Sequence, residues 1–205
     1  MDKNLKPVII HAESYKDIIL HACKYANSAI LEDEWKMVYG VLSGYSDDQF
    51  LYVKNAHPIA VGSAKEVSVK DQGYIKFGEI MEKLDSEGKG HFVIGSYHSK
   101  PGLSLFMSKV DLINHLGFQS RFNDAITIVF DHTLLGRKKE EKIDDNILTK
   151  FDTGFEIYRL TEVKLDRNSD EYETNYHKID YVVEGLNKFF FADVLATLSA
   201  KLSEE

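Results

Sequence analysis

The stretch that decides the fold runs from residue 95 to residue 111 and has the sequence GSYHSKPGLSLFMSKVD. The apolar run Phe92 to Ile94, followed by Tyr97, favours a buried strand that ends near His98. Pro101 and Gly102 come directly after this strand and predict a turn. The stretch therefore begins as a strand that leads into a turn.

A helix is expected after the turn. Ser104 suits an N-cap, apolar residues follow at helical steps, and Gly117 suits the helix end. Ser108 and Asp111 are three residues apart on this helix, so their side chains share one face. That face can point back at the strand end, and we expect both side chains to lie close to His98.

This pattern resembles the signature of the JAMM/MPN family, which contains zinc isopeptidases that cut ubiquitin-like proteins from lysines, together with inactive sister subunits. The signature is H-[ST]-H-P, six residues, S, two residues, D. In this chain its positions are filled by His98, Ser99, Lys100, Pro101, Ser108 and Asp111. Lys100 stands where the family has its second zinc-binding histidine. The family's general-base glutamate opens an E-V-x-G-x-L-x-G run, and here that run opens with Met37.

The two departures remove what the family chemistry needs. A catalytic zinc has three protein ligands and one open position for water, and the resemblance assigns only His98 and Asp111 as ligands. A lysine ammonium has no lone pair to give, and Met37 offers no carboxylate to take a proton from water. We therefore expect no zinc, no other cofactor and no hydrolysis by the family mechanism.

The same departures are consistent with each other electrostatically. Two buried carboxylates without a metal between them would cost several kcal/mol, but here one carboxylate is absent and a cation is present. We therefore hypothesise that the Lys100 ammonium lies near the metal position and pairs with Asp111, with His98 and Ser108 hydrogen-bonded around them.

Other interpretations remain open. Met37 can be an ordinary core residue and His98 an interior histidine. Glu34 reaches the missing base position if a helix runs through it. A divergent metal isopeptidase would recruit His115 or His132 as its third ligand. A further alternative is a stand-alone module that binds a ubiquitin-like modifier on the surface around residues 95–108.

The rest of the chain fits one α/β domain with a mixed β-sheet flanked by helices, of the JAMM/MPN (cytidine-deaminase-like) type. We assign residues 1–165 to this domain and residues 166–205 to a C-terminal extension with an amphipathic helix. Charged residues 136–152 indicate a solvated, mobile loop. Other expected elements are strands at residues 7–10, 125–130 and 155–163, helices at residues 14–31 and 74–84, a hairpin of residues 37–43 and 50–55, and an irregular span at residues 57–69.

The extension has an apolar stripe that one neighbour does not easily cover. Its residues are Phe189, Phe190, Phe191, Val194, Leu195, Leu198 and Leu202. They either pack on the domain itself or form an interface. Because MPN subunits commonly pair, the resemblance implies an active MPN/JAMM paralogue, or a second copy of this chain, as the partner.

The composition limits the kinds of partner and the cellular compartment that we expect. The net charge of −8 argues against a nucleic-acid surface, and no apolar run reaches membrane-spanning length. Cys23 is the single cysteine, which favours the reducing cytoplasm. We therefore expect a cytoplasmic, catalytically silent MPN-type subunit that acts as a scaffold or regulator of an active isopeptidase in a ubiquitin-like or proteasome-related system.

Overall fold

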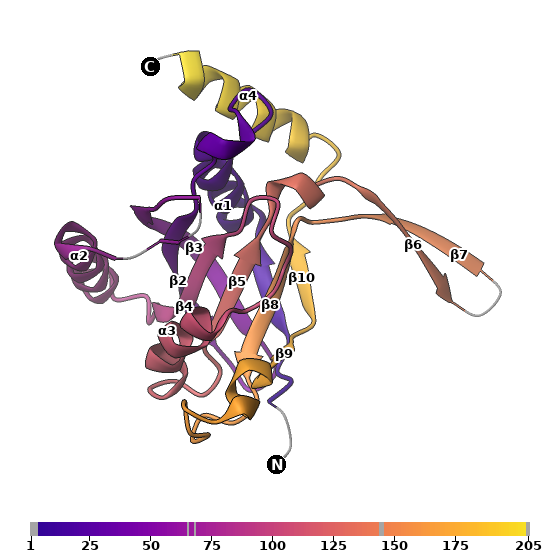
Figure 1. Cartoon of the computed structure of the whole chain (residues 1–205). Coiled ribbons are helices and arrows are strands. Elements are labelled where there is room, and N and C mark those ends of the chain that lie inside the picture. Colours follow the sequence, from indigo (N-terminus) through magenta and orange to yellow (C-terminus); the bar gives the residue numbers. More distant parts are fainter. Residues whose placement is uncertain (1–3, 65, 68, 144–145, 204–205) are drawn as a thin grey trace.

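The computed structural model describes residues 4–64, 66–67, 69–143 and 146–203 and has a central eight-stranded sheet with the order β10-β1-β3-β2-β4-β5-β8-β9 (Figure 1). The strands of this sheet are β1 (Val8–His11), β2 (Val38–Ser46), β3 (Leu51–Val61), β4 (Phe92–Ser99), β5 (Ile126–Phe130), β8 (Phe155–Leu160), β9 (Tyr176–Lys178) and β10 (Tyr181–Glu184). The α-helices are α1 (Ala12–Tyr25), α2 (Asp71–Glu87), α3 (Lys109–Gln119) and α4 (Phe190–Ser203). Short 3₁₀ turns lie at η1 (Glu32–Glu34), η2 (His132–Leu134) and η3 (Asp170–Thr174).

Helices α1 and α3 cover opposite faces of the sheet. Tyr97 of β4 points to α1, where its hydroxyl lies 2.9 Å from Nδ1 of His21. The next residue, His98, points to α3, where Nε2 lies 3.4 Å from Oδ1 of Asp111. Successive side chains of a strand point to opposite faces, so one strand supplies the core beneath α1 and the polar site beneath α3.

The sheet is mixed, as expected for the α/β class. Strands β2 and β3 form the predicted antiparallel hairpin, whereas β4 and β5 run parallel and are joined through α3. A larger apolar cluster lies between α1 and the sheet and a smaller one between α3 and the sheet. Burying a single leucine or isoleucine contributes about 1.5–3 kcal/mol, so both layers are firmly held.

Several expected boundaries were wrong. Helix α1 ends at Tyr25 rather than near residue 31, because the side chain of Asn27 donates to the carbonyl of Cys23 at 2.7 Å and the chain leaves the helical path. Ser14 is a buried residue inside this helix and not its cap. His57 and Pro58, expected in an irregular span, are part of the longer strand β3.

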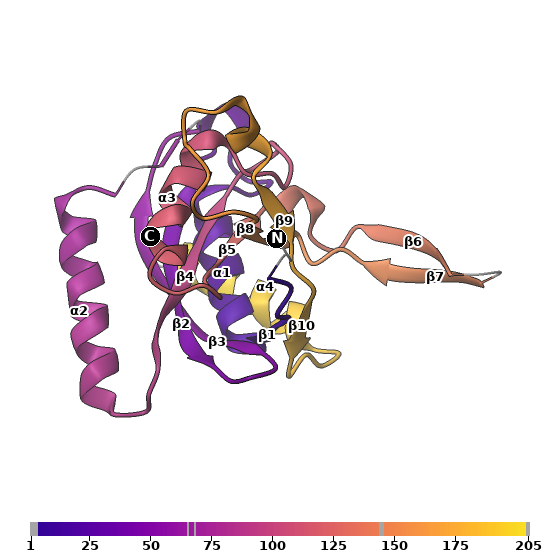
Figure 2. The ribbon, with the colours of Figure 1, turned by 90° about the horizontal axis from the view of Figure 1, so that it is seen from below.

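The charged segment 136–152, expected to be a loop, contains an antiparallel hairpin of β6 (Lys138–Ile143) and β7 (Asn146–Phe151) that projects from the body (Figures 1 and 2). The described side chains of this hairpin are exposed, and an exposed hairpin accepts charged residues as readily as a loop does, so the charge run did not distinguish the two.

The residues beyond 165 contribute to the sheet. Strand β9 pairs with β8 and strand β10 pairs with β1, so the expected division at residue 165 does not coincide with a break in the sheet. In α4, Phe190 and Val194 are buried and Phe190 stacks on Tyr15 of α1. The exposed members of the stripe are Phe189 (64%), Phe191 (42%) and Leu195 (63%). Leu198 packs partly on the core, and the side chain of Leu202 lies outside the described residues.

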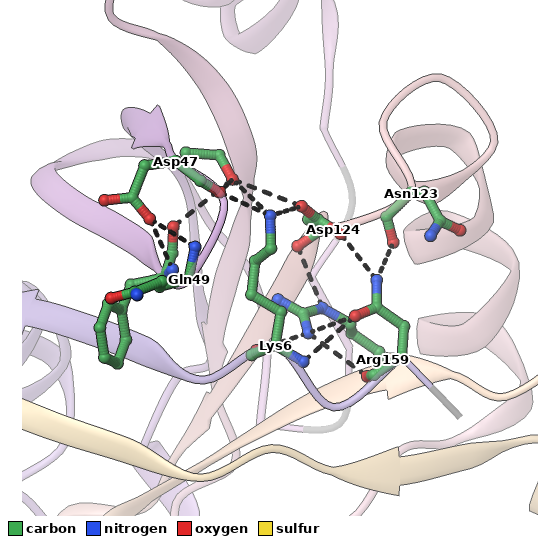
Figure 3. Close-up of polar contacts among 9 residues, drawn as sticks. Lys6, Asp47, Gln49, Asn123, Asp124 and Arg159 are labelled. Carbon is green, nitrogen blue, oxygen red and sulfur yellow. Dashed lines mark hydrogen bonds and ion pairs between the residues drawn. The ribbon is translucent and has the colours of Figure 1, made fainter. Parts of the chain in front are cut away.

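A polar network ties the segment before β1 to the site layer (Figure 3). The guanidinium of Arg159, on β8, is fully buried and donates to the backbone carbonyls of Asp124 at 3.0 Å and Lys6 at 2.7 Å. Lys6 forms an ion pair with Asp124 at 2.6 Å, and Asn4 donates to the same carboxylate at 2.7 Å. These contacts hold the turn between α3 and β5, and with it the C-terminal end of α3.

Candidate functional site

The site lies where β4 ends and α3 begins. His98 and Ser99 are the last two residues of β4 that pair with β5. The amide of Lys100 donates to the carbonyl of Phe130 at 2.8 Å, which extends the pairing by one more residue. His98 and Lys100 are two residues apart on an extended chain, so both side chains point to the α3 face. Both are 5% exposed.

Helix α3 begins later than the sequence suggested. Ser108 is its N-cap, and Asp111 is the third helical residue of a capping box. The Asp111 carboxylate accepts from the Ser108 amide at 2.7 Å and from the Ser108 hydroxyl at 2.6 Å. Ser104, the expected cap, has a positive φ of 74°, and Gly117 lies inside the helix rather than at its end. The three-residue spacing between Ser108 and Asp111 therefore forms the helix cap, and the cap holds the Asp111 carboxylate in place.

The far end of α3 is also fixed. The side chain of Gln119 donates to the carbonyl of Leu160 at 3.0 Å and accepts from the amide of Leu160 at 2.7 Å. The hydroxyl of Tyr158 donates to the backbone carbonyl of Leu105 in the segment before the helix. With both ends held to β8, α3 presents Asp111 to β4 in one orientation.

The Lys100 ammonium lies 2.7 Å from Oδ2 of Asp111, and this contact is the centre of the site. The two side chains are only 6% and 17% exposed. The ring of Phe106 covers the ammonium at 3.9 Å, which is cation–π geometry. The contact from His98 to the same carboxylate, at 3.4 Å, is long for a hydrogen bond and therefore mainly electrostatic. The lysine is thus held among a carboxylate, an imidazole and an aromatic face.

Asp111 is ionised at neutral pH. Burial by itself raises the pKa of this carboxyl, but the contacts from His98, Lys100 and Ser108 outweigh burial and hold the pKa well below its ordinary value. Because the folded-state pKa is lowered, the ionised group stabilises the native state above its ordinary pKa, and this contribution is lost as the pH falls toward the lowered value.

A small hollow of about 260 Å³ opens beside the pair. Met37, at the family's base position, lines it and is 5% exposed. Glu66 also lines the hollow, and sequence reasoning missed it because it comes from an irregular segment to which no spacing rule applies. The other lining residues are Tyr39, Val67, Ser96, His98, Lys100, Leu103, Phe106, Ser108, Val110, Asp111, Asn114 and Thr127.

The other proposed participants lie elsewhere. Glu34 is exposed in η1 and lines a different hollow with Trp35. His132 packs edge-on against Trp35 at 4.6 Å. His115 is 1% exposed within α3, and burial lowers its pKa to about 3, so its ring is neutral. Neither histidine lines the hollow beside His98.

The donor set does not fit a catalytic zinc. His98 and Asp111 provide two ligands, and the Lys100 ammonium already bonds Oδ2 of the Asp111 carboxylate. Throughout the described part of the chain, no three His, Cys, Asp or Glu side chains converge in a way that could hold a metal ion. The same part contains no helix with the length and apolar character of a membrane span.

The mixed sheet, the helix that begins at a Ser–Asp cap and the polar cluster between them define an MPN-type domain. The family model described as JAB1/Mov34/MPN/PAD-1 ubiquitin protease matches residues 3–123, which include every residue of the cluster. The chain belongs to this family, and both the predicted resemblance and the predicted fold class are confirmed.

The chain is also similar in sequence to individual curated proteins. The chain is 25% identical over 130 residues to the ubiquitin carboxyl-terminal hydrolase RPN11 of Saccharomyces cerevisiae, an alignment that covers 63% of this chain and 41% of that one. For the 26S proteasome regulatory subunit RPN11 of Candida glabrata the identity is 26% with the same coverage. For COP9 signalosome complex subunit 5 of Neurospora crassa it is 22%, covering 98% of this chain and 57% of that one. The chain thus spans well under two thirds of the length of these relatives.

The lowered pKa of Asp111 predicts a pH-dependent stability difference. At pH 7, Asp111→Asn should lower the free energy of unfolding by about 3 kcal/mol, because the Lys100 ammonium loses its partner in a largely buried place. The difference from wild type should shrink as the pH falls below about 4, where the wild-type carboxylate begins to be protonated in the unfolded chain. Urea unfolding between pH 7 and pH 3 measures it.

The exposed Asp48→Asn change is the matched control and should stay within about 0.5 kcal/mol of wild type at every pH. A difference for Asp111→Asn that is small at pH 7, or that does not change with pH, would show that the carboxylate is not held by its neighbours.

Proposed function

We propose that this chain is a catalytically silent MPN-type subunit that scaffolds or regulates an active JAMM isopeptidase in a ubiquitin-like or proteasome-related system. The observation that carries the proposal is the 2.7 Å contact between the Lys100 ammonium and the Asp111 carboxylate. An ammonium bonded to this carboxylate takes the place of a divalent ion, and it neutralises Asp111 without activating water.

The position of Met37 supports the same proposal. Its buried thioether lines the hollow beside the pair and can neither accept a proton from water nor bind a metal as a carboxylate does. Met37 therefore leaves the family's base position without a carboxylate. A function through contacts with other proteins then remains, and zinc or another cofactor has no role in it.

The relatives suggest the kind of assembly in which such a subunit would act. The names 26S proteasome regulatory subunit RPN11 and COP9 signalosome complex subunit 5 describe subunits of larger assemblies. For this chain we propose an active MPN/JAMM paralogue, or a second copy, as the partner. The apolar patch of α4, defined here as Phe191 and Leu195 of the helix with Phe189 just before it, is the proposed contact surface because all three side chains are exposed.

A divergent isopeptidase is the second candidate, and Glu66 is the observation that favours it. This carboxylate lines the same hollow as His98 and Asp111. It would serve as a general base if Lys100 left the carboxylate and a metal took its place. Zinc analysis distinguishes the two candidates, because the first requires no metal and the second requires one.

Zinc content therefore tests the proposal against this alternative. Wild-type protein produced in zinc-supplemented medium should contain far less than one zinc per chain by mass spectrometry, and it should leave ubiquitin chains uncut. The double change Met37→Glu and Lys100→His restores the family's base and third ligand, so it should bind close to one zinc per chain.

The matched control carries the same two kinds of change elsewhere, Met81→Glu in α2 with Lys89→His just after this helix, and should bind none. Stoichiometric zinc in wild type, with isopeptide cleavage that chelators abolish, would establish the enzyme instead. A restored variant that stays metal-free would mean that the pocket no longer has the family geometry.

Partner capture tests the proposed contact surface. Tagged chain added to its native extract should capture an MPN protein that has the complete zinc signature, or a second copy of itself. Phe191→Glu with Leu195→Glu should reduce that capture by about tenfold or more, because two charges would be buried in an apolar contact. The exposed Leu31→Glu change on the η1 side is the control and should leave capture unchanged. Equal capture by both variants would remove α4 from the interface.

A further inference from the structure

Strand β3 has an edge that its neighbouring strand leaves open. β1 pairs with β3 only at Leu51–Val53, and no other strand pairs with the rest of that edge in the described ranges. Ile59 lies against Gly73 of α2, and the next residue back, Pro58, lines a hollow beside His21 of α1. The two helices therefore flank the open edge from opposite faces of the strand, and Figure 2 shows α2 at the margin of the molecule.

A continuous groove follows this edge. Two hollows of about 470 and 370 Å³ adjoin each other and share His21, Lys24 and Pro58. The first runs toward α4 and the second toward the start of α2. Together they line the edge from Ala56 to Val61. We call this feature the β3 groove, and it lies away from the hollow that holds Lys100.

The β3 groove is basic although the chain carries a net charge of −8. Its described charged residues are Lys24, Lys70 and Lys76, with Asp17 at one end. Lys70 and Lys76 are exposed and form no ion pair with any described residue. Burial, with Lys76 and Lys24 nearby, lowers the pKa of His21 to about 4. Lys24 on α1 and Lys76 on α2 are therefore both close enough to His21 to influence its pKa.

We propose that the β3 groove binds an extended acidic segment of a partner protein. The backbone of the segment would lie along the open edge, where main-chain groups can hydrogen-bond as in strand addition. Pro58 has no N–H to offer, so pairing would use the residues that flank it. Successive side chains of an extended segment point to opposite faces. Consecutive acidic residues would thus meet Lys24 on the α1 side and Lys70 and Lys76 on the α2 side.

The open strand edge favours a peptide over a nucleic acid. Main-chain N–H and C=O groups in a row pair with another main chain, whereas single-stranded nucleic acids are held by aromatic stacking platforms. Among the described groove residues, Tyr25 is the single aromatic ring besides His21. The electrostatic part of the contact steers a segment of the opposite charge and weakens with added salt.

The experiment uses the full chain and a short fluorescein-labelled peptide of alternating aspartate and glutamate. Fluorescence anisotropy should show saturable binding at low ionic strength that weakens as salt is added. The groove variant, Lys70→Glu with Lys76→Glu, should bind at least about tenfold more weakly. The control variant, Lys138→Glu with Lys142→Glu on β6, makes the same change in net charge at exposed positions and should bind within about twofold of wild type. Circular dichroism verifies that both variants fold.

Backbone amide NMR gives a second readout, with peptide-induced shifts expected at Ile59–Val61. No saturable binding up to about 1 mM would overturn the proposal, as would equal losses in the groove and control variants. Binding of a lysine peptide as tight as that of the acidic peptide would overturn it too. Preferential binding of a uridine oligonucleotide would assign the groove to nucleic acid. Self-association that only the groove variant loses would assign it to a second copy.

Discussion

The ion pair between Lys100 and Asp111 is the interaction on which the rest of the site depends. The carboxylate is also part of the cap of α3, so the same oxygen atoms join the end of β4 to the start of this helix. A carboxylate in such a place needs a positive partner, because leaving it unpaired would cost several kcal/mol. In this chain a side chain provides that partner, and the domain can keep its shape without a metal.

On the proposal above, this ion pair separates the fold from the chemistry of the family. The sheet, the cap of α3 and the hollow beside Met37 are all present, and Met37 offers no carboxylate at this hollow. On the same proposal, the chain functions through surfaces that bind other proteins. The apolar patch of α4 consists of Phe189, Phe191 and Leu195, whereas the β3 groove reaches the same helix only at Leu198.

Much of the fold followed from local patterns in the sequence. Periodicity and short spacings predicted the hairpin of β2 and β3, strand β4, and the proximity of Ser108 and Asp111 to His98. These signals come from residues that are close together in the sequence. The start of α3 was misplaced because Ser104 and Ser108 both suit a cap, and only the reciprocal bonds with Asp111 decide between them. Glu66 was missed because tertiary packing alone brings its irregular segment to the hollow. Local periodicity was also silent on β9 and β10, which depend on pairing with distant strands.

The position of the Lys100 ammonium in the presence of zinc tests the central claim most directly. Crystals grown with excess zinc chloride, with anomalous diffraction recorded on both sides of the zinc absorption edge, would locate the metal and the amine in one experiment. Our account predicts the amine within hydrogen-bonding distance of Asp111 and no anomalous peak between Asp111 and His98. A zinc ion bound to these two residues, with Lys100 displaced toward solvent, would contradict it.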